Sequence, residues 1–107
     1  MTDILFEDGS ILVCIKPAGT LSELCDKENS LPRIICNERA LDTLYTVHRL
    51  DREVCGVILY AKTADAAKKL SADVAERRIK KEYIAIVEGT PEKDSDTLVD
   101  LLFKDSA

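Results

Sequence analysis

Residues 46–63 read TVHRLDREVCGVILYAKT and join a charged segment to an apolar one. A histidine, two arginines and an aspartate fall between His48 and Arg52, and the run Val57–Ala61 follows directly after Gly56. A continuous apolar run of this length is typical of a strand that is covered on both faces. The stretch therefore predicts a buried strand whose entrance carries charged side chains.

A β-hairpin is predicted near the N-terminus. Two apolar runs, Ile4–Phe6 and Ile11–Ile15, flank the turn-forming sequence EDGS, in which Gly9 can adopt positive φ. Pro17 and Gly19 close the second run, because proline cannot donate to a strand ladder. These signals indicate two antiparallel strands joined by a short turn.

Two helices are predicted, one on each side of the charged segment. The first lies within LPRIICNERALDTL, residues 31–44, with Ser30 as its cap and Pro32 in its first turn. The second runs from about Ala64 to Arg78, with Thr63 as its cap. Its apolar side chains recur every three or four residues, at Ala67, Leu70 and Val74.

A further strand is predicted over residues 81–87, within KKEYIAIVEG. Its side chains alternate, with Tyr83 on one face and Ile84 on the other. With strand 57–61 and the helix between them, it would form a crossover unit. The elements together predict an α+β fold, a mixed, largely antiparallel sheet with helices packed on it.

Length and composition place the chain among small globular domains. Its 107 residues are 46% hydrophobic and 33% charged, which suits a single domain with a modest core. The chain has no run of about 18 apolar residues and no signal-peptide layout at its N-terminus. We therefore expect a cytoplasmic protein without a membrane span, and one domain over residues 1–107 with an acidic tail from about residue 92 that contains the cluster LVDLLF.

Basic residues are concentrated in the middle of an acidic chain. The net charge is −5, yet residues 46–81 carry nine basic and five acidic side chains. A local basic face can contact phosphates even when the whole chain is acidic. The alternative is an ordinary solvated helix face, and charge alone leaves both interpretations open.

The four cysteines include no C-x-x-C pair, so neither a zinc site nor another metal site is expected. Cys14 and Cys55 lie in apolar, strand-like contexts, which favours free buried thiols. A disulfide framework is not expected in a reducing compartment.

Asp51 is the strongest candidate for chemistry, because Arg49 and Arg52 flank it just before a buried strand. Nearby positive charge favours the ionised carboxylate. Such a group can act as a nucleophile or a base without a metal ion. A loop salt bridge or a turn cap is the alternative. His48 is the only histidine in the chain, and we interpret it as an orienting or packing group.

The segment HRLDREVCGVILYAKT closely resembles the catalytic signature of RluA-type pseudouridine synthases. ILFEDGSILVCIKPAGTL is similar to the N-terminal hairpin of that family, and KKEYIAIVEG to a later strand that carries a tyrosine. The resemblance covers about residues 2–90, in the family's order. It implies that the chain is the first half of a pseudouridine synthase catalytic domain.

The resemblance also implies a reaction and its residues. Asp51 matches the essential carboxylate that isomerises uridine to pseudouridine in structured RNA (rRNA or tRNA), without a cofactor. Arg49 matches the arginine that helps to fill the place of the flipped base, and Tyr83 the tyrosine that packs against uracil. Arg52 is expected to contact the substrate. The alternative for Tyr83 is a core aromatic. Phosphate contacts are expected from the basic run Arg77, Arg78, Lys80 and Lys81.

The match has two gaps. Val54 and Cys55 replace the family's Thr-Ser, and nothing after Gly89 resembles the family's later GRTHQIR-like segment, whose basic residue pairs with the catalytic aspartate. Two functions remain open. One is an RNA-modifying isomerase that is complete only with a second half. The other is a non-catalytic remnant that binds RNA weakly or binds another protein. In either case the uncovered apolar strands predict self-association or a second chain that completes the sheet.

Overall fold

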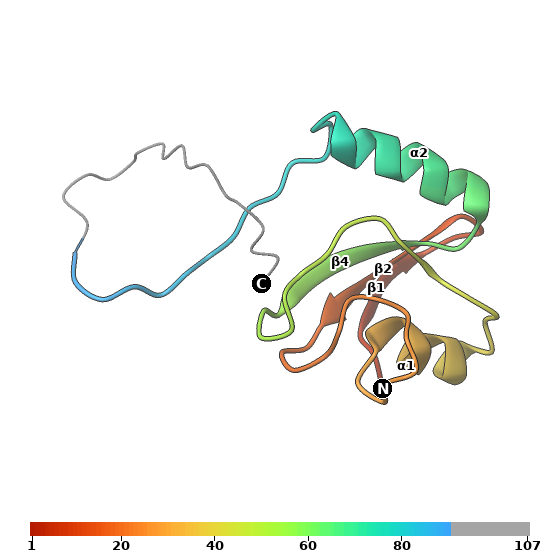
Figure 1. Cartoon of the computed structure of the whole chain (residues 1–107), viewed down its shortest axis with the longest axis horizontal. Coiled ribbons are helices and arrows are strands. Elements are labelled where there is room, and N and C mark those ends of the chain that lie inside the picture. Colours follow the sequence, from red (N-terminus) through yellow and green to blue (C-terminus); the bar gives the residue numbers. More distant parts are fainter. Residues whose placement is uncertain (91–107) are drawn as a thin grey trace, which may run out of the picture.

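Four strands form one sheet in the spatial order β1-β2-β4-β3. The computed structural model describes residues 1–90, so the predicted acidic tail and its LVDLLF cluster lie outside the described residues. Figure 1 shows one helix on each side of the sheet. The elements follow one another along the chain as β1 (Ile4–Glu7), β2 (Ile11–Lys16), α1 (Leu31–Arg39), β3 (Tyr45–Thr46), β4 (Gly56–Ala61) and α2 (Ala64–Ala75).

This arrangement confirms the predicted α+β fold. All three strand pairs among the described residues are antiparallel. The predicted hairpin is confirmed as β1 and β2, and its turn is closed by Asp8. The Asp8 carboxylate accepts the backbone N–H groups of Ser10 (2.7 Å) and Ile11 (2.8 Å). These bonds lower the pKa of Asp8. Gly9 does not have positive φ, so the turn depends on the aspartate and not on the glycine.

One face of the sheet packs on α1 and forms the hydrophobic core. Leu12 lies opposite Tyr60, and Cys14 lies opposite Ile58, in the pair of strands β2 and β4. All four side chains are fully buried, so β2 and β4 are the centre of the fold. The apolar residues that α1 adds to this core are Leu31, Ile35 and Cys36.

Both helices begin where the sequence predicted. Ser30 precedes α1, but its hydroxyl donates to the Glu23 carbonyl (2.6 Å) and does not cap the helix. The Thr63 hydroxyl does cap α2, because it accepts the backbone N–H of Ala66 (3.1 Å). The position of the cap residue was therefore predicted correctly for both helices. The predicted side-chain hydrogen bond from the cap forms only in α2.

The second helix, α2, is shorter than predicted and lies on the surface. It ends at Ala75 instead of Arg78, because Arg77 adopts a φ of 59°, which a right-handed helix cannot continue. The predicted apolar stripe, which includes Leu70 and Val74, is half-buried, and no residue of α2 is fully buried. The helix therefore covers only part of the second face of the sheet.

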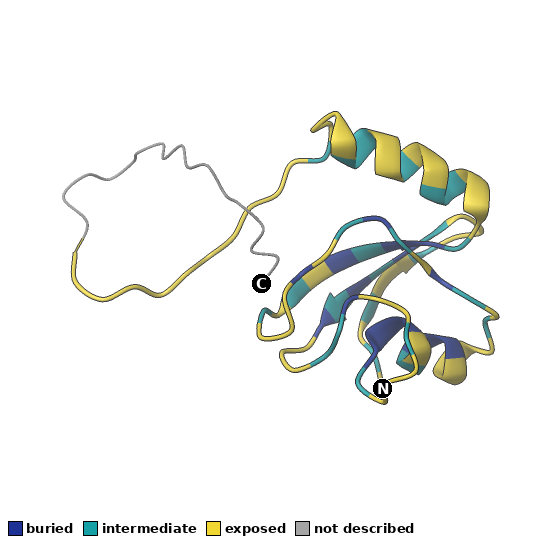
Figure 2. Ribbon diagram, viewed as in Figure 1, coloured by how far each residue is buried: buried dark blue, intermediate teal, exposed yellow. Residues whose placement is uncertain are grey.

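That second face remains open near the start of β4. Val57, at the start of β4, is 56% exposed, and Phe6, on the edge strand β1, is 51% exposed. Figure 2 shows yellow segments in the sheet. The prediction that the strand 57–61 is covered on both faces was therefore wrong at its first residue, Val57.

The predicted strand over residues 81–87 was also wrong. Residues 80–90 contain no helix or strand, and Tyr83 and Ile84 are 63% and 101% exposed. After α2 the chain runs away from the sheet (Figure 1). A strand exists only with a hydrogen-bonded neighbour, and this segment has none among the described residues. The predicted crossover unit is therefore not formed. The fourth strand is the unpredicted β3.

The cysteines are all free: Cys14 and Cys36 are buried, Cys25 is half-buried and Cys55 is exposed. The prediction of a buried Cys55 was wrong, because the residue lies in the loop before β4 and not within the strand. Within residues 1–90, no three His, Cys, Asp or Glu side chains gather as metal ligands would. None of the helices described is long and apolar enough to cross a membrane.

Candidate active site

Asp51 lies at the first position of a β-turn that leads into β4. The Val54 N–H donates to the Asp51 carbonyl (2.9 Å), and residues 51–53 are exposed. Leu50, just before the turn, belongs to the core cluster. Gly56, just after it, has a φ of 150°, which other residues rarely adopt. A buried leucine and a permissive glycine therefore hold the turn at the start of β4 and leave Asp51 exposed.

Two buried polar side chains contact the backbone of this loop. Lys16 Nζ donates to the carbonyls of Arg52 (3.0 Å) and Val54 (2.7 Å). The Ser22 hydroxyl donates to the Leu50 carbonyl (2.6 Å) and accepts the Leu50 N–H (2.9 Å). Sequence reasoning missed both residues. A signal existed for Lys16, because it continues the inward-facing alternation of β2.

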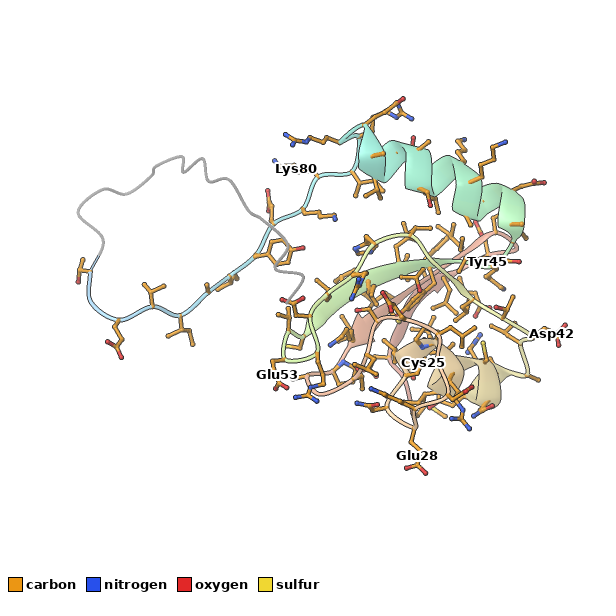
Figure 3. The ribbon with its side chains drawn as sticks, viewed as in Figure 1. Cys25, Glu28, Asp42, Tyr45, Glu53 and Lys80 are labelled. Carbon is orange, nitrogen blue, oxygen red and sulfur yellow. The ribbon has the colours of Figure 1, made fainter. Side chains whose placement is uncertain are left out.

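The two arginines beside Asp51 pair with other carboxylates. Arg49 Nε lies 2.9 Å from Glu23 Oε1, and Arg52 Nε lies 2.9 Å from Glu53 Oε1. All four side chains are more than half exposed, so the pairs contribute little to stability. Among residues 1–90 the Asp51 carboxylate has neither a hydrogen bond nor an ion pair. The alternative given for Asp51, a loop salt bridge or a turn cap, is therefore not formed among the described residues. Figure 3 shows Glu53 at the tip of the loop.

His48 ties the loop to the open edge of β4. Its Nε2 atom accepts the backbone N–H of Leu59 (3.0 Å), just beyond the point where β3 stops pairing with β4. Its Nδ1 atom is buried. Burial lowers the pKa of His48, and the positive charge of Lys81 lowers it further. The imidazole is therefore neutral near pH 7, and its hydrogen bond and burial agree with the orienting or packing role predicted for it.

A cavity of about 550 Å³ lies between this loop and the segment that follows α2. Leu50 and Val54 line it on the loop side, and Tyr83 lines it from the opposite segment. Asp51 lies between the two loop residues in sequence but is not part of the lining. The structure therefore brings Tyr83 close to the Asp51 turn without placing both side chains in one cavity.

A second hollow of about 650 Å³ is lined by Arg49, Lys81 and Glu23. Lys81 lines both hollows, Lys80 lines the first and Arg49 the second, which gives the region a basic rim. The rest of the basic run is partly neutralised. Arg78 pairs with Asp73 (2.7 Å) and also with Glu76, and Lys80 pairs with Glu82 (3.2 Å).

Arg77 and Lys81 are the exposed cations of this run that form no ion pair among the described residues. Figure 3 shows Lys80 on the segment beyond α2, on the side of the second face of the sheet. The four cations therefore follow the end of α2 and the chain after it, and they do not form one compact patch.

The structure thus places an exposed aspartate in a turn beside a cavity, on an antiparallel α+β sheet. Residues 10–105 match the model of the RNA pseudouridylate synthase family. The chain belongs to this family and is of the RluA type.

Several relatives share this similarity. The chain is 38% identical over 102 residues to the dual-specificity RNA pseudouridine synthase RluA of Salmonella typhi, and the match covers 92% of this chain and 45% of that protein. It is 34% identical over 94 residues to the pseudouridylate synthase RPUSD2 of Mus musculus, and this match covers 85% of the chain and 17% of the relative.

A solved structure, human RNA pseudouridylate synthase domain containing 4, superposes with a TM-score of 0.57 at 29% identity. The superposition covers 71% of this chain and 30% of that one. The chain therefore spans less than half the length of these relatives, and it covers only part of the family's catalytic domain.

Proposed function

We propose that this chain is the part of an RNA pseudouridine synthase that carries the catalytic aspartate, and that residues 1–107 belong to one partial synthase domain. The observation that carries the proposal is Asp51 itself. In a chain of this family, its carboxylate is exposed and free of partners among residues 1–90, on a turn beside a cavity that Tyr83 lines. A carboxylate in this position is accessible to a ribose or a base.

The reaction proposed is the isomerisation of uridine to pseudouridine within structured RNA, either rRNA or tRNA. The N-glycosidic bond between uracil N1 and ribose C1′ breaks, the uracil turns, and C5 forms a new bond to C1′. The proton on C5 leaves to solvent, and N1, freed from C1′, takes up a proton, so that the product is an isomer of the substrate. The target nucleotide must leave the base stack to reach the carboxylate. Asp51 acts as nucleophile or base, and no cofactor takes part.

The neighbouring side chains are proposed to bind the substrate. Arg49 occupies the position of the flipped base, and its exposed guanidinium has only a surface ion pair with Glu23 to break. Arg52 contacts the substrate from within the turn. Tyr83 packs against the uracil ring, and its 63% exposed side chain on the cavity wall is free to do so. Phosphate contacts come from the basic run Arg77, Arg78, Lys80 and Lys81.

A second chain, or a second copy, is proposed to complete the sheet. The open face near Val57 and the exposed Tyr83 and Ile84 form an apolar surface of the kind that marks interaction sites. The same surface favours the second candidate function, a non-catalytic module that binds RNA weakly or binds another protein.

Substitution of Asp51 by asparagine tests the catalytic proposal, in a protein that contains this chain followed by the rest of a synthase domain. The substitution keeps the shape of the side chain and removes its charge. Pseudouridine formation in RNA should disappear while RNA binding persists. Asp42→Asn is the matched control, since Asp42 is an exposed aspartate remote from Glu53 and the turn (Figure 3). Pseudouridine formation by the Asp51 variant at the rate of the control would show that Asp51 is not the catalytic carboxylate. Absence of activity in the parent and in the control as well would favour the non-catalytic module.

A further inference from the structure

Lys16 is a charged residue that has no exposed surface. It follows Leu12 and Cys14 on the inward-facing side of β2, so the strand directs its side chain into the core. A buried ammonium group is costly unless each of its donors finds an acceptor. Lys16 Nζ has three N–H donors, and its three acceptors are the carbonyls of Val54 (2.7 Å), Arg52 (3.0 Å) and Pro17 (3.2 Å).

Two of these acceptors belong to the turn that carries Asp51. Arg52 directly follows Asp51, and Val54 closes the turn. The Arg52 carbonyl also accepts the N–H of Gly19 (2.6 Å), from the loop just after β2. The backbone on the C-terminal side of Asp51 is therefore held by the end of β2 and the loop that follows it.

The backbone on the N-terminal side of Asp51 is held by a different residue. Ser22 is 5% exposed and exchanges two hydrogen bonds with the backbone of Leu50, as donor to its carbonyl and acceptor of its N–H. The Ser22 carbonyl in turn accepts the hydroxyl of Tyr60 (2.8 Å), a fully buried residue of β4. The contact with Leu50 is therefore anchored in the core.

We propose that Lys16 and Ser22 are positioning residues that fix the backbone on the two sides of Asp51. The inference rests on the proposed function, in which Asp51 is the catalytic residue. Together the two side chains hold the backbone of residues 50, 52 and 54, while the Asp51 side chain, between residues 50 and 52, is exposed. Displacement of a reacting carboxylate by about 1 Å can lower the reaction rate about a hundredfold. Because the turn lies outside the helices and strands, hydrogen bonds from other residues are needed to fix its position.

Charge supports the same assignment. Burial lowers the pKa of Lys16, and the neighbouring carboxylates of Glu53 and Asp51 oppose that shift. The interaction between the Lys16 ammonium and the Asp51 carboxylate is attractive. Lys16 therefore supports the turn through its hydrogen bonds and through its charge.

The loop contacts can be tested on the 107-residue chain without any activity. Ser22→Ala should make hydrogen exchange of the Leu50 amide about tenfold faster, because that amide no longer has its buried hydrogen-bond acceptor. Lys16→Met should have the corresponding effect on the amides of Val54 and Gly19. Lys62→Met is the matched control, since Lys62 binds Glu7 and the Asp8 carbonyl at the opposite end of the sheet. Unchanged exchange at Leu50 in Ser22→Ala would overturn the proposal, even if Lys16→Met does not fold.

Kinetics distinguish positioning from a merely structural role, in the protein that also contains the rest of a synthase domain. Ser22→Ala should lower kcat about tenfold or more and leave KM for RNA nearly unchanged, because a misplaced carboxylate affects the chemical step. Faster exchange with an unchanged kcat would refute positioning. Full activity of Asp51→Asn would refute the proposed function itself, whereas an inactive Asp51→Asn beside a fully active Ser22→Ala would refute only the positioning role.

Discussion

Replacement of His48 tests how the loop is attached to the sheet. In His48→Ala the Leu59 N–H loses the imidazole Nε2 acceptor at 3.0 Å. A half-buried donor without a partner costs about 1–3 kcal/mol of stability. For a domain of this size, each kcal/mol corresponds to a change in Tm of about 4–8 °C. The alanine variant should therefore unfold at a clearly lower temperature than the parent protein at about pH 7.5.

His48 also makes stability depend on pH. Burial lowers its pKa in the folded chain below the unfolded value of about 6.5. As pH falls through about 6.5, the unfolded state takes up a proton before the folded state does, so the free energy of unfolding decreases. The stability that the neutral His48 side chain contributes above about pH 6.5 is lost progressively as the pH falls to the pKa of His48 in the folded chain. The free energy of unfolding changes by at most about 1.4 kcal/mol per pH unit in this range. The carboxylates of Glu7, Asp8 and Glu38, whose pKa values are lowered, lose their contribution in a separate window, below about pH 4.5.

Urea unfolding followed by circular dichroism, at low protein concentration and between about pH 8 and pH 5.5, measures both effects. His48→Gln is the control, because its amide oxygen can accept the Leu59 N–H and does not titrate. We expect the parent to lose stability as pH falls in this range, the glutamine variant to stay level, and the alanine variant to be level and less stable. A glutamine variant that declines as steeply as the parent would refute the assignment of this pH dependence to His48. An alanine variant as stable as the parent would show that the hydrogen bond contributes nothing.

Two further predictions concern RNA binding and the isolated chain. Replacing Arg77, Arg78, Lys80 and Lys81 together by glutamine should flatten the dependence of log Kd on log salt concentration, by about 0.7–0.9 for each phosphate that the protein no longer neutralises; an unchanged slope in a filter-binding titration would mean that the run is only a solvated surface. The 107-residue chain alone should be inactive or nearly so in a tritium-release assay on RNA labelled at uridine C5, and should self-associate in light scattering across a concentration series, because the exposed apolar residues around Val57 and Tyr83 favour association. A chain that stays monomeric at high concentration and turns over RNA would contradict both expectations.

The parts of the fold that depend on local sequence were predictable. The hairpin of β1 and β2 follows from two apolar runs around EDGS, and the start of α2 follows from the cap at Thr63. Each of these sequence signals lies within a few residues of the turn or helix that it predicts. The motif around Asp51 likewise lies in one continuous stretch of sequence.

The parts that depend on distant partners were not predictable. Strand β3 is only two residues long and exists through its pairing with β4. Residues 81–87 have the alternation of a strand but no neighbour among the described residues to pair with. The alternation of β2 indicates that Lys16 faces inward, but two of its carbonyl partners lie 36 and 38 residues further along the chain. No local pattern identifies those partners.

The most direct test of the central claim is a single-turnover measurement with saturating enzyme and C5-tritiated RNA, in a protein that contains this chain and the rest of a synthase domain. Asp51→Asn is compared with Asp42→Asn and with the parent, and the affinity of each for the same RNA is measured in parallel. We predict that Asp51→Asn binds the RNA with a Kd close to that of the parent and releases no tritium above background, while Asp42→Asn matches the parent in both. A rate constant for Asp51→Asn close to that of the parent would contradict the assignment of Asp51 as the catalytic carboxylate.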